Sequence, residues 1–362
     1  MKIFASLKKN KKIHFILKAL KHINDDEYLN LFLDRETDPL LLEFKSLGKE
    51  YDDKRFYLIS EVGKGYGFFA EFHAVLSKIA FAEKFGFTPI VSWGRDFLYY
   101  DKSRMNITEN AFEYFFKQPS ALKFQDVLEA KFVTEAKAAQ GLWMEKDLDK
   151  GMDLSEEYEE EISRVYKKYI RFTDAIDKKL SEDCGELLGN CKILGVHFRG
   201  TDFKMNYDNH PVSVKIEQEF EVIDQAIQNQ GFQKIFLATD EKDAVQAFRD
   251  RYGEMVVCYE DVFRGEGNTS VAFSTSNRDN HKYRLAYEVL RDMQTLSLCS
   301  GLIAGVSQVS ICARIAKRAR EEKYDYLEII DNGKNYNNRK FAKRFFRRNE
   351  RNANKRRQKN QE

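Results

Sequence analysis

The carboxyl-terminal half of the sequence alternates between short apolar runs and segments of helical length. Apolar runs of strand length occupy residues 193–198, 234–239, 255–259, 302–306 and 324–330. Segments with helical character separate them at residues 214–230, 242–252, 281–299 and 309–320. Consecutive parallel strands need such spacers, because a right-handed crossover must carry the chain back across the sheet. The alternation therefore predicts a parallel, Rossmann-like sheet within a domain at residues 186–335.

The first of these strands, Ile193 to Phe198, leads directly into a charged loop that starts at Arg199. Side chains two residues apart on a strand share a face, so His197 and Arg199 are expected to point the same way. They lie at the carboxyl edge of the predicted sheet, where open α/β sheets bind ligands. A guanidinium presents a planar fork that matches phosphate oxygens, so Arg199 is the predicted phosphate-binding residue.

Two more strands end in polar loops at the same predicted edge. Thr239, Asp240 and Glu241 follow the apolar run Lys-Ile-Phe-Leu-Ala, and Ser307 and Gln308 follow another apolar run. The agreement of three strand ends predicts a nucleotide pocket. For Asp240 two roles remain open, a place close to a diphosphate or a cap on the helix that begins at Lys242.

A second α/β unit is predicted in the amino-terminal half, within residues 51–185. A strand at 55–60 precedes a glycine loop, a helix and a second strand at 88–93, and the loop glycines are Gly63, Gly65 and Gly67. Alternating glycines let the backbone approach a ligand, and the following helix offers unpaired N–H groups to an anion. A flexible turn is the alternative. His73, one turn inside this helix, is expected to be a packed core histidine, and residues 1–50 and 94–180 are expected to be mainly helical.

Composition limits the classes of function. The 362 residues include 60 basic and 58 acidic side chains, so bulk charge does not favour nucleic acid as a partner. Five scattered cysteines suit buried thiols in a reducing compartment, and no apolar amino-terminal stretch has the length of a signal peptide, so a cytoplasmic location is expected. The Asp-x-Asp pair, Asp147 and Asp149, lies in a charged run, where a solvated surface is expected rather than a metal site.

Both ends of the chain are basic. Residues 1–22 contain seven lysines and no acidic residue, and residues 339–362 contain eleven lysines or arginines against Glu350 and Glu362. The tail, residues 336–362, also carries three phenylalanines. Such a segment suits peripheral contact with the inner face of an anionic membrane, where a lipid-linked saccharide acceptor would be presented. A disordered, solubilising tail is the equal alternative.

The motif His-x-Arg-x-x-Asp, formed by His197, Arg199 and Asp202, resembles that of the fucosyltransferase superfamily of α-1,6-, α-1,2- and protein O-fucosyltransferases. The Thr239-Asp240 strand end and the Ser307 loop fit the same pattern. The glycine loop and the His210-Pro211 pair resemble the α-1,6 branch. The resemblance implies a GT-B-like fold of two Rossmann-like domains with parallel sheets and an active site in the cleft between them. It also implies inverting transfer of L-fucose from GDP-fucose to an oligosaccharide acceptor, without a metal or another cofactor.

The resemblance also assigns roles to individual residues. It implies that Arg199 meets the diphosphate, with the glycine-loop amides and the Ser307 hydroxyl, and that His197 and Asp292 contact guanine. A carboxylate can accept from the guanine N1–H and N2–H₂ groups, but Asp292 could instead pair with Arg291 or a nearby lysine.

Two positions depart from the family pattern. Asp208 is the nearest carboxylate to the position of a glutamate in the α-1,6 pattern, so it becomes the candidate base. Asp202 is expected to orient Arg199 or cap the next segment, and Gly200 stands where a second arginine is usual. Another nucleotide sugar as donor, or a non-catalytic nucleotide- or glycan-binding protein, are the alternatives.

Overall fold

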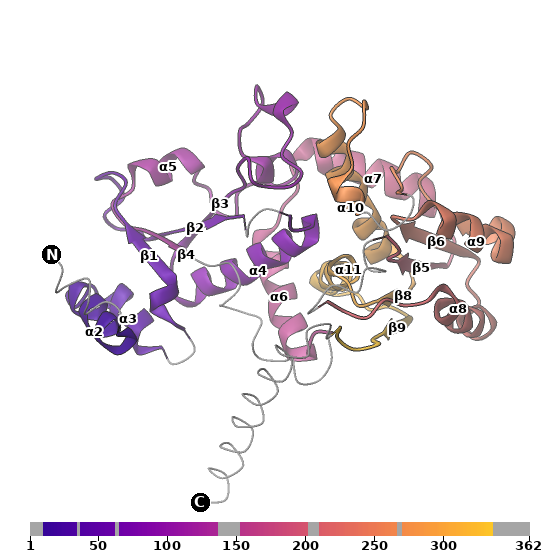
Figure 1. Cartoon of the computed structure of the whole chain (residues 1–362), viewed down its shortest axis with the longest axis horizontal. Coiled ribbons are helices and arrows are strands. Elements are labelled where there is room, and N and C mark those ends of the chain that lie inside the picture. Colours follow the sequence, from indigo (N-terminus) through magenta and orange to yellow (C-terminus); the bar gives the residue numbers. More distant parts are fainter. Residues whose placement is uncertain are drawn as a thin grey trace, which may run out of the picture.

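The computed structural model describes residues 10–34, 37–61, 65–136, 153–201, 210–265 and 270–335. Within these residues the chain forms two α/β units, each built on its own sheet (Figure 1). The segments 62–64, 202–209 and 266–269 lie outside the described residues, and the first two belong to the predicted glycine loop and to the loop that contains Asp202 and Asp208. The predicted cleft between the units therefore stays a prediction.

The second unit contains the parallel sheet that the sequence predicts. Its strands are β5 (Ile193–Phe198), β6 (Lys234–Thr239), β7 (Val256–Val257), β8 (Gly301–Gly305) and β9 (Tyr326–Ile330). Their order is β7-β6-β5-β8-β9, with every neighbouring pair parallel. This is the Rossmann order, in which the direction of winding reverses between β5 and β8. Only β7 differs clearly from its prediction, because it pairs over two residues instead of five.

Helices cover both faces of this sheet. The alternate β5 residues Leu194, Val196 and Phe198 pack on one face in an apolar cluster with α8 (Ile216–Gln230) and α9 (Lys242–Tyr252). The opposite face packs against α10 (His281–Leu298) and α11 (Gln308–Ala319). Continuous apolar runs such as β5 are expected for parallel strands, since both of their faces are buried.

The first unit has a mixed sheet, so the prediction of parallel sheets is wrong for one strand pair. Its order is β1-β4-β2-β3, from β1 (Leu42–Lys45), β2 (Phe56–Ser60), β3 (Thr88–Ser92) and β4 (Val133–Ala136). β2 pairs in parallel with β3 and β4, whereas β1 pairs with β4 antiparallel. The predicted helical region 1–50 is therefore helical only in part, because β1 belongs to the sheet.

The helices of the first unit are α2 (Lys11–Lys21), α3 (Asp26–Leu33), α4 (Phe68–Lys84) and α5 (Phe124–Glu129). α4 is the crossover that connects β2 to β3, as the sequence predicts. The region 94–180 is less helical than expected. It contains β4, two short 3₁₀ helices (Lys102–Arg104 and Ala111–Tyr114) and irregular segments before α6 (Glu156–Tyr169) and α7 (Asp174–Leu188).

Helices α6 and α7 pack against the second unit as well as the first. α6 contacts both α4 and α11, and α7 contacts α10. The predicted boundary at residue 185 falls inside α7, which ends at Leu188.

A single apolar cluster joins the two units. It extends from Tyr57 in β2 and Leu76 in α4 to Ile315 in α11 and Leu302 in β8. α4, α6 and α11 lie between the two sheets (Figure 1). Among the described helices, none combines the length and the apolar character needed to cross a bilayer.

Candidate functional site

His197 occupies the point where the winding of the second sheet reverses. It is the fifth residue of β5, and its Nδ1 atom lies 3.2 Å from the hydroxyl oxygen of Ser307, which follows β8. The crevice at this point, beyond the strand ends, is where open α/β sheets hold their ligands. The side chain is buried, and burial together with the positive charge of Arg199 lowers the pKa of His197 to about 4. The imidazole is therefore neutral near pH 7.

Regular strand and helix spacing predicts that Asp292 in α10 lies near the level of His197, over the same face of the sheet. A Cβ built on Gly195 would lie 3.1 Å from Leu296 of α10, so this face of β5 meets that helix. Two residues further along β5, about 6.6 Å, is His197. One turn earlier in α10, about 5.4 Å toward the same edge, is Asp292. We therefore expect His197 and Asp292, the two side chains that the resemblance assigns to guanine, to lie at a similar level.

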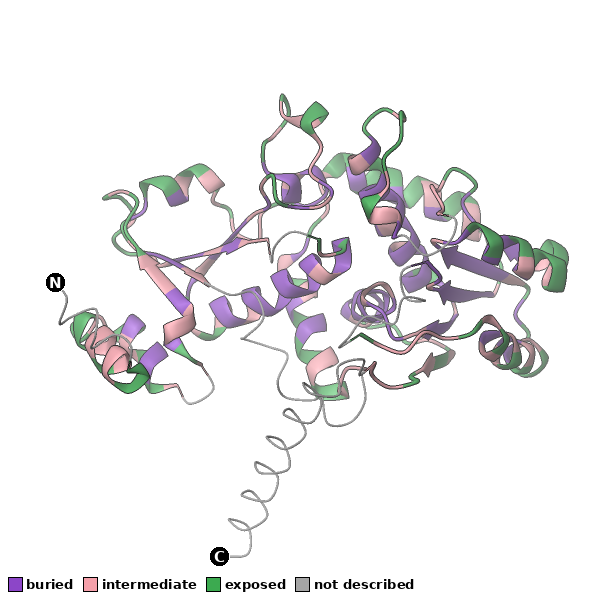
Figure 2. Ribbon diagram, in the orientation of Figure 1, coloured by how far each residue is buried: buried purple, intermediate pink, exposed green. Residues whose placement is uncertain are grey.

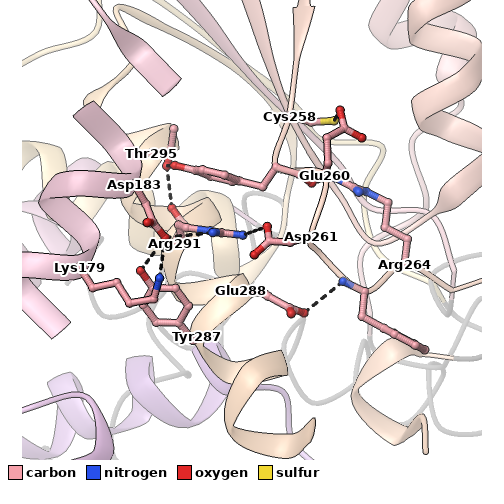
Figure 3. Close-up of polar contacts among 12 residues, drawn as sticks. Lys179, Asp183, Cys258, Glu260, Asp261, Arg264, Tyr287, Glu288, Arg291 and Thr295 are labelled. Carbon is pink, nitrogen blue, oxygen red and sulfur yellow. Dashed lines mark hydrogen bonds and ion pairs between the residues drawn. The ribbon is translucent and has the colours of Figure 1, made fainter. Parts of the chain in front are cut away.

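The carboxylate of Asp292 has no hydrogen bond or ion pair within the described part of the chain, and the alternative pairing with Arg291 is wrong. Arg291 donates to Asp183 at 2.9 Å and to Asp261 at 2.5 Å, and its guanidinium lies 3.8 Å from the ring centroid of Tyr259. Figure 3 shows Arg291 between Asp183 and Asp261. Burial raises the pKa of Asp292 to about 7, against the opposing effects of Arg264 and Arg291. A buried carboxyl without a partner is costly unless a ligand supplies donors.

Arg199 is held at the strand end by Asp240. The guanidinium donates to Asp240 Oδ2 at 2.5 Å, the same oxygen accepts from the Thr201 hydroxyl at 2.6 Å, and Oδ1 accepts from the Gly200 N–H at 3.0 Å. Burial alone would raise the pKa of Asp240, but Arg199, Thr201 and Gly200 together hold it below its usual range. Asp240 therefore organises the loop after β5. It does not cap α9, whose N-cap residue is Glu241, with no side-chain capping bond.

The other strand-end residues serve mainly to shape the turns. The Thr239 hydroxyl accepts from the Glu241 N–H at 3.2 Å, which closes the turn between β6 and α9. Ser307 caps α11, accepting from the Ser310 N–H at 3.1 Å, and thereby holds its hydroxyl against His197.

Gln308 connects the site to the first unit through His73. The Gln308 Oε1 atom lies 2.8 Å from His73 Nδ1, and His73 Nε2 lies 3.1 Å from the Tyr158 hydroxyl of α6. His73 is fully buried, as the sequence predicts, and burial lowers its pKa to about 4. Gln308 was predicted to bind the donor, whereas here its side chain joins α11 to α4. This bridge brings the amino-terminal turn of α4 toward the strand ends of the second sheet.

The glycine loop precedes α4 on the side that faces the second unit. Gly65 has φ +96°, which an L side chain rarely adopts, and its built Cβ would lie 3.6 Å from the ring of Phe273. Gly67 is the N-cap of α4, with no side-chain capping bond and no atom within 4 Å of its built Cβ. Gly63 lies outside the described residues. The two described glycines leave backbone N–H groups of α4 uncovered by side-chain caps, as anion binding requires.

Position 200 must be glycine because the side chain of Glu241 lies against it. A Cβ at position 200 would lie 1.9 Å from Glu241 Oε2 and 2.7 Å from Glu241 Cβ. The space beside Arg199, where a second arginine would begin, is therefore filled by a buried acidic side chain. Glu241 belongs to the strand-end loop that the sequence predicts at the pocket, but neither it nor Thr201 was predicted to bind the donor.

The variant Gly200→Ala is expected to lower the free energy of unfolding by about 1–3 kcal/mol, because the added methyl overpacks against Glu241. Removing Glu241 in the double variant Gly200→Ala/Glu241→Ala should recover part of that loss. Urea unfolding measures both, and Gly185→Ala in α7, with open space around its Cβ, is the control and should lose no stability. Strictly additive losses at positions 200 and 241 would contradict this packing.

Several predicted residues cannot be placed. Asp202, Asp208, Asp147 and Asp149 lie outside the described residues, as does the tail from residue 336. Among the residues that are described, no group of three or more His, Cys, Asp or Glu side chains is arranged to hold a metal ion.

Two hollows in the described surface lie away from the strand ends. One, of about 480 Å³, lies between α7 and α10 near the start of β5, where Cys184, Cys191 and Ile193 line it. The other, of about 190 Å³, is lined by Lys179, Asp261 and residues of α10. The first is at the amino edge of the sheet, opposite the predicted ligand edge, so the strand-end residues remain the candidate site.

Comparisons with known proteins gave likenesses in structure only. No protein-family model matches the sequence, and no curated protein matches it. The structure is similar to that of NodZ α-1,6-fucosyltransferase soaked with GDP-fucose, at 16% identity and a TM-score of 0.44, over 73% of this chain and 92% of that one. It is similar to fucosyltransferase NodZ from Bradyrhizobium at 14% identity and a TM-score of 0.42, over 72% and 93%. It is also similar to POFUT1 in its apo form, at 12% identity and a TM-score of 0.43, over 78% and 99%.

Proposed function

We propose that the chain is a glycosyltransferase that moves L-fucose from GDP-fucose to a sugar acceptor. The observation that supports the proposal is that His197 and Arg199 lie at the end of β5, beside the winding reversal of the second sheet, while the Asp292 carboxylate of α10 has no partner among the described residues. A nucleoside diphosphate requires polar side chains that bind its nucleobase and a cation that binds its phosphates. His197 and Asp292 can serve the first purpose, and the Arg199 guanidinium can serve the second. The choice of fucose rests on the resemblance of the His-x-Arg-x-x-Asp motif.

Guanine fits the base side of the site. The unpaired Asp292 carboxylate can accept from guanine N1–H and N2–H₂, which adenine does not offer in this arrangement. None of the described hydrogen bonds uses His197 Nε2, so this nitrogen can form a hydrogen bond with the guanine base. Arg199 is the first residue after β5, and we assign it to the diphosphate of the same nucleotide.

The chemistry proposed is an inverting displacement. The bond between the fucosyl carbon and the β-phosphate oxygen breaks, and the electron pair departs with GDP. The acceptor hydroxyl oxygen forms the new bond to the same carbon and gives its proton to a base, for which Asp208 is the candidate. Arg199 stabilises the charge that develops on the departing diphosphate, and Asp240 holds the guanidinium in place for that purpose. Proposed in this way, the reaction depends on no metal.

A donor-hydrolysis screen tests the proposal. Purified full-length protein is incubated with GDP-fucose, GDP-mannose, UDP-glucose and ADP-glucose, each with and without EDTA, and release of the nucleotide is measured. GDP-fucose should be consumed fastest, and EDTA should leave its rate unchanged. Preference for a uridine donor would overturn the assignment of Asp292. Loss of activity in EDTA would overturn the metal-free mechanism. Asp147 and Asp149 would then become the candidate ligands of a divalent metal ion. Binding of GDP without turnover of any donor would favour the non-catalytic alternative.

GDP binding is expected to weaken as the pH falls below about 7, because only the ionised Asp292 carboxylate can accept from both guanine donors. Below the pKa the ionised fraction falls tenfold per pH unit, which sets the limiting slope of affinity. Above it the affinity should be nearly constant. Asp292→Asn should lower GDP affinity by roughly 10- to 100-fold and abolish this pH dependence, since a hydrogen bond to a charged group contributes about 1.5–3 kcal/mol.

Calorimetric titration in buffers of different ionisation enthalpy measures both effects, because GDP binding near pH 7 should release a proton. The exposed carboxylate Asp243, replaced by Asn, is the control. An Asp292→Asn protein that binds GDP as the parent does, with the same pH profile, would remove Asp292 from the site.

A further inference from the structure

The amino-terminal helix α2 exposes an apolar stripe. Ile16 and Leu20 are each 55% exposed, and Ile23, in the turn after the helix, is 53% exposed. Their spacing of four and three residues places them along one side of a helix. The described chain has ten exposed large hydrophobic side chains, and these three are the ones that form such a row along a helix and the turn that follows it. A row differs from single exposed apolar residues, which are ordinary on protein surfaces.

The opposite side of α2 is fixed to the first unit. Phe15 packs edge-on against Phe32 of α3, with ring centroids 5.6 Å apart, and the His22 ring lies 4.6 Å from that of Phe44 in β1. The ammonium of Lys18 donates to the carbonyl oxygens of residues 39 and 42, at 2.7 and 2.5 Å. Figure 2 shows α2 in the colours of intermediate and exposed residues along its whole length. The helix is thus held by one face, and the described residues do not cover the other.

Positive charge borders the stripe. Lys11, Lys12 and Lys21 are exposed, and the helix contains no acidic residue. The preceding residues 1–9 add three lysines and no acid. Among the acidic residues that follow, Asp25 and Glu27 are paired with Arg55, at 2.5 and 2.9 Å. An apolar row flanked by ammonium groups matches an anionic lipid surface, which offers an apolar interior beneath negative headgroups. A nucleic acid would match the charges but would leave the apolar row in water.

We propose that Ile16, Leu20 and Ile23, with Lys11, Lys12 and Lys21, form a docking surface for an anionic membrane. α2 lies at the end of the first unit that is remote from the second sheet (Figure 1). The surface can therefore rest on a bilayer without covering the strand ends of the second unit. This inference does not depend on the reaction proposed above.

The test is co-sedimentation of the full chain with vesicles of equal parts phosphatidylglycerol and phosphatidylcholine. The parent should bind these vesicles and should bind phosphatidylcholine vesicles much more weakly. Ile16→Ser/Leu20→Ser should lower the partition coefficient roughly tenfold or more, because two apolar side chains no longer enter the interface. Lys12→Glu/Lys21→Glu should also lower it, with the loss shrinking at high salt. Ile107→Ser, which removes an aliphatic side chain 66% exposed elsewhere, is the control and should bind as the parent does.

Three outcomes would overturn the docking surface. The first is failure of the parent to bind either kind of vesicle. The second is unchanged binding by Ile16→Ser/Leu20→Ser, which would assign membrane contact to the basic tail. The third is a parent that is dimeric by light scattering and becomes monomeric in the same variant, which would show that a second copy covers the stripe. Near-ultraviolet circular dichroism of each variant verifies that the fold is retained.

Discussion

Replacing Arg199 by alanine is expected to reduce turnover of the GDP-sugar by at least about 10²- to 10³-fold, the loss typical when a fixed donor to a developing negative charge is removed. The guanidinium is the described cation at the end of β5, and Asp240 fixes its orientation through a 2.5 Å hydrogen bond. Arg199→Lys should recover only a small part of the rate. A lysine keeps the charge but cannot pair with Asp240 and present two coplanar donors to a diphosphate.

Initial rates with saturating donor, together with GDP affinity from calorimetry, separate binding from chemistry. The control is Arg251→Ala, a surface arginine of α9 that pairs with Asp224. Its rate should match that of the parent. An Arg199→Ala protein that is folded and retains near-normal transfer would refute the role of Arg199 in leaving-group stabilisation.

The variant Asp240→Ala is expected to lower the free energy of unfolding by about 3–5 kcal/mol and to reduce turnover nearly as much as Arg199→Ala does. Removing one member of a largely buried ion pair leaves the other charge without compensation. It also leaves the Thr201 hydroxyl and the Gly200 N–H without their acceptor. The folded-state pKa of Asp240 is below its ordinary value, so its contribution is complete at neutral pH and is lost on acidification below that ordinary value.

Urea unfolding at pH 7 measures the stability loss, and a double variant, Arg199→Ala/Asp240→Ala, measures the coupling. If the two residues act as one unit, the double variant should lose less stability than the sum of the single variants. Equal turnover by parent and Asp240→Ala would show that Arg199 does not need this carboxylate for its orientation.

The second sheet was largely predictable because its strands are buried on both faces. β5, β6, α9 and most of α10 and α11 occupy the residues that the apolar pattern assigned to them. The first sheet was harder. β1 and β4 are short, with sequences Leu-Glu-Phe-Lys and Val-Thr-Glu-Ala, and neither carries a run that distinguishes a strand from a loop. They become strands because they pair with each other and with β2.

Site residues on a single strand could be predicted from the sequence. Roles that depend on contacts with residues far away in the sequence could not. His197 and Arg199 follow from strand periodicity, and Asp292 from the family resemblance. The role of Asp240 was left open because it is decided across two strands, by the loop after β5. Gln308 was placed with the donor, since the sequence carries no sign that His73, 235 residues away, would hold its side chain.

Because the two units share one apolar cluster, neither unit is expected to fold when it is expressed alone. α6 contacts both α4 and α11. The buried Arg314 of α11 pairs with Asp153, just before α6, at 2.7 Å and with Glu159, in the first turn of α6, at 3.1 Å. Expressing either unit alone would expose one side of this cluster and leave Arg314 or its carboxylates unpaired. We therefore expect the two units to melt in a single cooperative transition, and structural work on isolated halves to yield insoluble protein.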